Sequence, residues 1–168
     1  METMTVERTI HAPIDEVFAW LTTTTNYTSS PLVLRCRLTR HGGTAPYGVG
    51  AVRDHLWLIG WFRERITHYD PPYATEYLVE RSLPPSRHEL GRMTFTEVDG
   101  GTRVRWTTRA EIPVPLLGPL LTRLLARPII TRTFRNILDA AETALVRHPR
   151  PESSGPTAQA PVRGPEPR

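Results

Sequence analysis

Apolar and polar residues alternate along seven short stretches of the chain, and this period of two predicts β-strands. In residues 4–11, Val6 and Ile10 fall on one face, while Glu7 and Thr9 fall on the other. Six further strand patterns follow, at residues 32–40, 50–59, 61–69, 73–82, 88–98 and 102–112. Because only short glycine- or proline-rich turns separate most of them, we expect neighbouring strands to be antiparallel.

Two segments carry helical patterns instead. Pro13, followed by Asp15 and Glu16, predicts the start of a helix, because proline and acidic residues favour a first turn. Leucines and other apolar residues at helical spacing run over residues 115–147, and we expect Pro128 to kink or split that helix. The order of elements predicts an α+β fold in which a curved seven-stranded antiparallel sheet packs around a long C-terminal helix. Such a sheet can leave an interior cavity, where ligands usually bind.

Composition limits this domain to residues 1–148. Residues 149–168 hold six of the seventeen prolines and no aromatic residue, so we expect a disordered proline-rich tail. The remaining length suits one domain with a single core.

The charged residues exclude several classes of function. All 21 basic residues are arginine, which excludes a lysine Schiff base and a lysine-containing phosphate loop. The net charge of +4 is spread along the chain without a basic run, so we expect no nucleic-acid partner. The single cysteine, Cys36, excludes an internal disulfide and is interpreted as an ordinary buried residue. With no apolar run at the N-terminus, we expect a soluble, cytoplasmic protein.

Several short motifs occur in a characteristic order. They are VERTIHAP at residues 6–13 followed by DEVF, GVGA at 48–51, Glu64 with YDPP at 69–72, Tyr77, DGGTRVRW at 99–106, and Ala141 with Glu142. In this order and spacing, residues 4–146 resemble the START/Bet v1-like (SRPBCC) superfamily, in its polyketide cyclase/dehydrase and lipid-transport branch. The resemblance implies the helix-grip fold, with a ligand cavity between the concave sheet face and the C-terminal helix. It does not fix an activity, because this fold supports many functions.

Strand alternation then selects the residues that face this cavity. Phe62 and Glu64 share the inward face with Ile66, and Tyr77 and Val79 point the same way as Arg81. On the last strand, Val104, Trp106 and Thr108 form the inward row. Strand 50–59 is ambiguous, because either Arg53, His55 and Trp57 or the residues between them face inward.

Glu64 and His55 are the candidate catalytic residues. In an apolar cavity the pKa of Glu64 would be raised, so that it could act as a general acid or base, and His55 could transfer a proton. The alternatives are that Glu64 pairs with an arginine such as Arg53 or Arg81 and only holds strands together, and that His55 is structural. The candidate ligand-binding residues are Arg53, Trp57, Phe62, Tyr77, Val79, Arg81, Trp106, Leu121 and Phe134.

No metal site or cofactor motif is visible in the sequence, so we expect neither. The proline-broken segment 113–128 is open to three interpretations: core packing, a lid over the cavity, or a surface that touches a membrane transiently.

We therefore expect a protein that binds a hydrophobic small molecule, such as a lipid or polyketide-like compound. The first alternative is a polyketide aromatase/cyclase or dehydratase that acts on a poly-β-ketone chain. The second is a protein-interaction module without a ligand. The sequence leaves the oligomeric state open between monomer and homodimer.

Overall fold

The computed structural model describes residues 1–113, 120 and 122–147 of the chain. Within them the elements are β1 (Glu2–Ile10), α1 (Ile14–Thr22), the 3-10 helix η1 (Thr24–Ser29), β2 (Val33–Arg40), β3 (Val52–Trp57), β4 (Gly60–Asp70), β5 (Ala74–Leu83), β6 (Arg87–Val98), β7 (Gly101–Glu111), the π-helical turn η2 (Thr122–Ala126) and α3 (Arg127–Arg147). Leu121 and the tail at 149–168, both part of the predictions above, lie outside the described residues.

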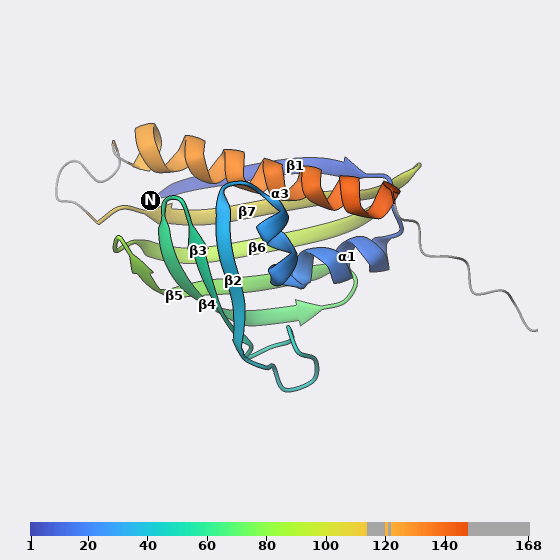
Figure 1. The fold of residues 1–168 in the computed structure, drawn as a ribbon, viewed down its shortest axis with the longest axis horizontal. Helices are drawn as coiled ribbons and strands as arrows, with labels where there is room; N and C mark the ends of the chain where they lie inside the picture. Colours follow the sequence, from blue (N-terminus) through green and yellow to red (C-terminus); the bar gives the residue numbers. More distant parts are fainter. Residues whose placement is uncertain (114–119, 121, 148–168) are drawn as a thin grey trace, which may run out of the picture.

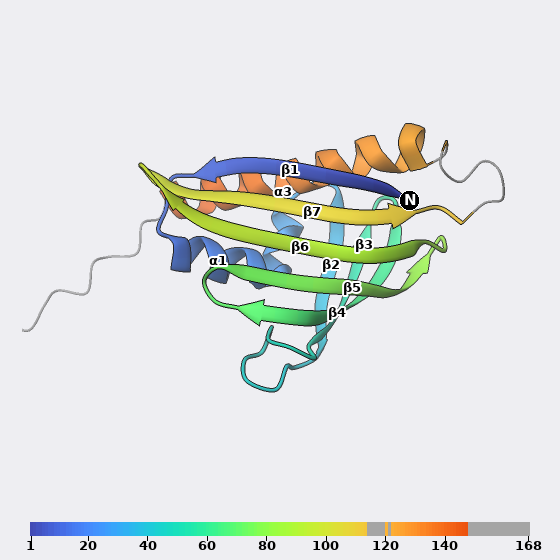
Figure 2. The same cartoon turned by 180° about the vertical axis from the view of Figure 1, so that it is seen from behind.

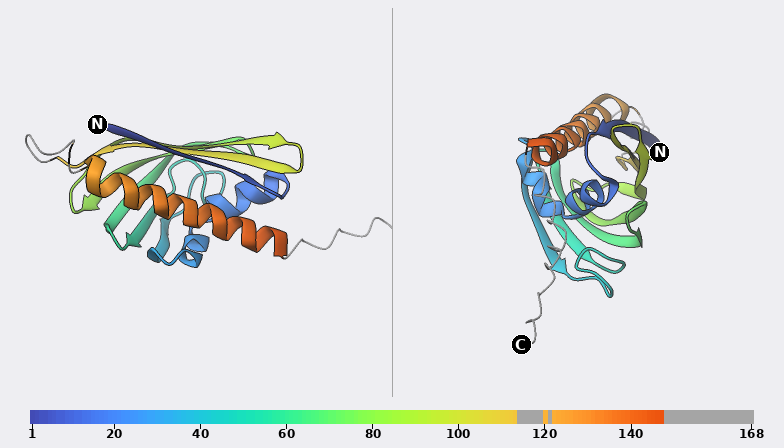
Figure 3. Two further views of the ribbon diagram at one scale, coloured as in Figure 1. Left: turned by 90° about the horizontal axis from the view of Figure 1, so that it is seen from above. Right: turned by 90° about the vertical axis from the view of Figure 1, so that its right-hand side faces the viewer.

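One antiparallel sheet, in the order β1-β7-β6-β5-β4-β3-β2, forms the frame of the molecule (Figure 1). The sheet curls so that its concave face wraps around the helices (Figure 3). Along that face, α3 packs against β1, while α1 and η1 lie against α3 and η1 also packs on β2. This is the predicted helix-grip architecture of a curved seven-stranded sheet and a long C-terminal helix.

Helix α1 begins where the sequence predicted, whereas the predicted start of the C-terminal helix, at residue 115, lies outside the described residues. Helix α1 follows directly after Pro13, with Asp15 and Glu16 in its first turn. Pro128 is the second residue of α3, and the turn before it is π-helical, so the predicted interruption is present. Proline lacks the backbone N–H that the interior of a helix needs. Because the π-helical turn ends at Ala126 and α3 begins at Arg127, Pro128 lies in the first turn of α3, where this N–H is not needed.

The two faces of the sheet differ in chemistry. The concave face carries the core, including Val6, Ile10, Val104 and Trp106, which pack with Ile137 of α3. The convex face, seen in Figure 2, carries ion pairs between neighbouring strands. These pairs are Arg63–Asp54, Arg65–Glu80, Arg92–Glu76, Arg103–Glu7 and Arg109–Glu89. Much of the arginine in this chain therefore lies on a solvated surface.

Register shifts interrupt several ladders of the sheet, and two of them change which side chains face the cavity. In the β4–β5 ladder, Glu64 pairs with Val79 but Arg63 pairs with Arg81, so β5 has one extra residue there. In the β6–β7 ladder, the same happens between His88 and Leu90. Each β-bulge reverses which side chains face inward beyond it.

None of the described helices is both long enough and apolar enough to cross a membrane.

Candidate functional site

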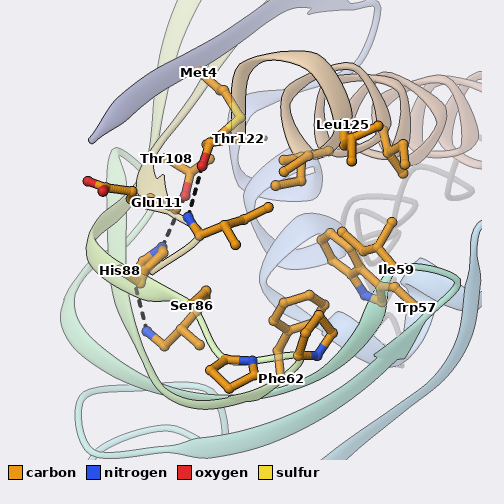
Figure 4. Close-up of a pocket in the computed structure, with 18 of the residues that line it drawn as sticks. Met4, Trp57, Ile59, Phe62, Ser86, His88, Thr108, Glu111, Thr122 and Leu125 are labelled. Atoms are coloured by element: carbon orange, nitrogen blue, oxygen red, sulfur yellow. Dashed lines mark hydrogen bonds between the residues drawn. The ribbon is translucent and has the colours of Figure 1, made fainter. Parts of the chain in front are cut away.

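A cavity of about 380 Å³ lies between the concave sheet face and the first turns of the C-terminal helical segment. Figure 4 shows Trp57 and Ile59 on one side of the cavity, His88 and Thr108 on the other, Leu125 above and Phe62 below. Its volume is near the lower end of the usual range for ligand pockets, about 300–1,000 Å³. The cavity is therefore suited to a compact ligand.

The walls are mainly apolar. The apolar lining residues are Met4, Trp57, Leu58, Ile59, Phe62, Val79, Pro84, Pro85, Ala110, Ile112, Leu125, Ala126, Ile129, Ile130 and Phe134. The polar lining residues are Glu64, Tyr77, Ser86, His88, Thr108, Glu111 and Thr122. Apolar ligand surface would be removed from water along most of this wall, and hydrogen bonds would be available only at a few places.

Three segments with exposed leucines contribute to the cavity wall through Leu58, Pro84 and Leu125, and we call these segments the mouth. They are the β3–β4 turn with Leu58, the end of β5 and the connection after it with Leu83, and the η2 turn with Leu124 and Leu125. Leu58, Leu83 and Leu124 are 61%, 67% and 62% exposed. Exposed leucines around an opening are typical of a surface that meets an apolar partner or ligand.

Strand β3 presents Arg53, His55 and Trp57 to the interior, which settles the ambiguity left by the sequence. Arg53 and His55 are each only 1% exposed. Arg53 Nε donates to Glu64 Oε2 at 2.9 Å, and His55 Nε2 lies 3.2 Å from the same oxygen. The Arg53 guanidinium also lies over the Tyr77 ring, 4.9 Å from its centroid. The alternative in which Glu64 pairs with an arginine is thus present in the structure, with Arg53 as the partner.

The predicted rise in the pKa of Glu64 is wrong. Burial does raise the pKa of this carboxyl, but His55 and Arg53 together lower it more strongly, to about 2. Glu64 is therefore a carboxylate across the physiological range and a weak base. Its catalytic role stays a prediction, and the geometry does not favour it.

His55 belongs to a filled part of the interior. Its ring stacks on Tyr27 at a centroid distance of 6.0 Å, and its Nδ1 lies 3.1 Å from Cys36 Sγ. Burial raises the pKa of the Cys36 thiol to about 12, so this cysteine is a thiol rather than a reactive thiolate. Among the described residues that line the cavity, neither His55 nor Arg53 is present. We call Arg53, His55, Glu64, Cys36 and Tyr27 the buried cluster, and only its Glu64 reaches the cavity.

Arg81 does not face the cavity, contrary to the prediction from strand parity. The bulge in β5 pairs it with Arg63, whose side chain bonds Asp54 on the convex face. Arg81 is exposed accordingly. The prediction assumed unbroken alternation from Tyr77 through Arg81, and one inserted residue reverses it.

His88 lines the cavity, although it is not among the site residues predicted from the sequence. The bulge at the start of β6 turns it inward. Its Nδ1 accepts a hydrogen bond from the Val79 backbone N–H at 3.2 Å, so Nε2 carries the proton and donates to Thr108 Oγ1 at 3.0 Å (Figure 4). Burial lowers the pKa of His88, which keeps the ring neutral.

Tyr77 completes this polar wall. Its hydroxyl accepts a hydrogen bond from Trp106 Nε1 at 3.0 Å, and its ring stacks on His88. A Cβ on Gly91 would lie 2.2 Å from the Tyr77 ring, so only glycine lets the ring occupy this place. Gly91 in the middle of a strand is the signal in the sequence that could have located this close approach.

The remaining ligand-binding predictions divide by position. Trp57, Phe62, Tyr77, Val79 and Phe134 line the cavity. Trp106 lies behind Phe134, with the two rings stacked at 4.0 Å between centroids. For the described part of the chain, no group of three His, Cys, Asp or Glu residues is placed to hold a metal ion.

The chain is similar to several known proteins. A family model described as polyketide cyclase / dehydrase and lipid transport matches residues 1–146. No curated protein matches the chain significantly. The solved structure of TTHA0849 from Thermus thermophilus shares 17% identity at a TM-score of 0.72, over 88% of this chain and 99% of that one.

Two further solved structures share the fold. Ara h 8.0201 is 12% identical at a TM-score of 0.65, over 87% of this chain and 98% of that one. The di-domain ARO/CYC StfQ from the steffimycin biosynthetic pathway is 18% identical at a TM-score of 0.58, over 88% of this chain and 45% of that one. At such identities these likenesses concern the fold alone.

Proposed function

The chain belongs to the polyketide cyclase / dehydrase and lipid transport family, and from this we propose that it binds a hydrophobic small molecule in the cavity between the sheet and α3. The observation that carries the proposal is the cavity itself, about 380 Å³ with mainly apolar walls. Each fully buried large apolar group of a ligand would contribute on the order of 1.5–3 kcal/mol by leaving water. A fold filled only for stability would close such a space with side chains.

Binding explains the described residues better than catalysis does. StfQ is an ARO/CYC protein, but the candidate base of the present chain, Glu64, is held as a carboxylate by Arg53. The neutral His88 uses both ring nitrogens in hydrogen bonds. Neither group is poised to take a proton from a ketone chain, so cyclase or dehydratase activity is the weaker proposal.

We further propose that the mouth touches a membrane transiently when ligand enters or leaves. Leu58, Leu83 and Leu124 present apolar surface there, and the exposed Arg123 and Arg127 flank it on the helical side. Apolar side chains with neighbouring arginines favour the interface of an anionic bilayer.

The primary test is native mass spectrometry of the purified protein, compared with its denatured mass. We expect a non-covalent ligand in the native spectrum, or uptake from a panel of lipids and aromatic polyketides. Val79→Trp fills the cavity and should abolish uptake. Leu90→Trp is the matched control, because Leu90 pairs with Arg109 on the convex face and should leave uptake intact.

The alternatives give different results. Protein that stays apo throughout the panel would contradict ligand binding and favour a protein-interaction module. Turnover of a poly-β-ketone substrate that Glu64→Gln abolishes without loss of binding would favour the enzyme.

A further inference from the structure

We propose that the inner end of the cavity binds the neutral hydroxyl group of an alcohol or phenol and discriminates against a carboxylate. The inference rests on the proposed function and specifies the chemical class of its ligand. It follows from the donors and acceptors that Glu64, Tyr77 and Thr108 offer to the cavity.

Glu64 supplies the acceptor. Both of its polar contacts, from Arg53 Nε and His55 Nε2, go to Oε2. Among the described residues Oε1 has no hydrogen-bond partner, and the side chain, only 8% exposed, lines the cavity. Because Oε1 is not one of the fully enclosed polar atoms, it can accept a hydrogen bond from a ligand that carries a donor.

Tyr77 and Thr108 supply the donor. The Tyr77 oxygen accepts from Trp106, and Thr108 Oγ1 accepts from His88, whose other nitrogen is occupied by Val79 N–H. In these bonds both hydroxyl oxygens act as acceptors, so their own hydrogens can be donated to a ligand. A ligand hydroxyl could thus donate to Glu64 and accept from this pair at once.

The charges at this end exclude the common alternatives. Arg53 and Glu64 balance each other, so a bound ion would add an uncompensated charge to a buried site. A ligand carboxylate would also lie beside the Glu64 carboxylate. A ketone could accept from Tyr77 but would leave Glu64 Oε1 without a donor. A hydroxyl group is neutral, donates one hydrogen bond and accepts another, and therefore fits this end of the cavity.

Three compounds with the same ring system test the inference: 2-naphthol, naphthalene and 2-naphthoate, with binding measured by their own fluorescence. For the unaltered protein we expect 2-naphthol to bind at least about tenfold more tightly than 2-naphthoate, and more tightly than naphthalene. Thr108→Val should weaken 2-naphthol several-fold and leave naphthalene unchanged.

Glu64→Gln is the variant that tests the ligand preference most directly. It leaves Arg53 without its counter-charge, so the preference should reverse and 2-naphthoate should gain at least about tenfold over 2-naphthol. Asp54→Asn is the matched control: it removes a carboxylate from the convex face of β3, and the original preference should remain. If Glu64→Gln does not fold, the unaltered protein and Thr108→Val decide the question.

The possible outcomes separate the inference from the proposed function. Equal or tighter binding of 2-naphthoate by the unaltered protein overturns the hydroxyl preference while leaving hydrophobic binding intact. Binding of naphthalene as tight as that of 2-naphthol does the same. If none of the three binds and the native mass spectrum shows only apo protein, the proposed function itself is overturned.

Discussion

Two adjoining regions of the same concave sheet face differ in packing: one is filled by side chains, and the other encloses a cavity. In the buried cluster, η1 brings Tyr27 down onto His55, and the space is filled by stacked rings and an ion pair. A few residues along, where the helical segment begins, Trp57, Phe62 and Phe134 surround an open cavity. Both regions include inward-facing residues of β3 and β4. The helix that covers a strand, more than the direction of its side chains, decides whether a residue meets a ligand.

The ion pair inside the buried cluster should give the largest effect on stability. Arg53→Met leaves the Glu64 carboxylate buried without its partner, and we expect a loss of about 3–5 kcal/mol in the free energy of unfolding. Arg63→Met breaks an ion pair on the convex face and should cost much less, because solvent screens exposed charges. Denaturant unfolding of both variants checks this. Similar losses would show that the cluster contributes no more than the surface does.

Acid should weaken the same cluster. The folded-state pKa of Glu64 is about 2, below the ordinary value of 4.5, so the folded protein binds fewer protons than the unfolded chain between these values. The associated stability is present above pH 4.5 and is lost as pH falls towards 2, by about 3 kcal/mol. Unfolding measured along this pH range should show a shallower loss for Glu64→Gln. Identical slopes for the two proteins would contradict the assigned pairing.

The boundary between the two regions depends on Gly91. A methyl group there would collide with the Tyr77 ring, so Gly91→Ala should destabilise the fold by about 1–3 kcal/mol and displace the ring. The measurement is thermal unfolding together with 2-naphthol binding, which should weaken. Gly43→Ala is the control, because a methyl group at Gly43 would meet no atom within 4 Å and should change neither.

Substitutions in the mouth should change the stability of the fold least. Leu124 is exposed and lies outside the cavity wall, so Leu124→Asp should change the unfolding free energy by about 0.5 kcal/mol or less. Co-sedimentation with anionic vesicles should nevertheless decrease. Unchanged sedimentation, or none with the unaltered protein, would contradict the membrane contact.

Strand alternation predicted which side of the sheet many side chains face, but not the places where the alternation is interrupted. Phe62, Glu64, Tyr77 and Trp106 face inward as expected. Arg81 and His88 do not follow the alternation, because each lies beyond a β-bulge that has no clear mark in the sequence.

The sequence also could not predict which inward-facing residues of β3 are covered by other side chains and which reach the cavity. The alternation allowed Arg53, His55 and Trp57 on one face, yet only Trp57 reaches the cavity. The difference arises from Tyr27, whose position depends on how η1 packs against β2. The pKa of Glu64 could not be predicted for the same reason, since it depends on partners from another strand.

The pairing of β1 with β7 affects how the protein can fold during its synthesis. Thr5 and Thr107 bond across this ladder although 102 positions separate them in the chain. On the ribosome, β1 is made well before β7 and has no strand partner until β7 emerges, so its backbone hydrogen-bonding groups stay unpaired during that time. The sheet cannot be completed before residues 101–111 are made, and we expect a chain truncated before residue 101 to need chaperones to stay soluble.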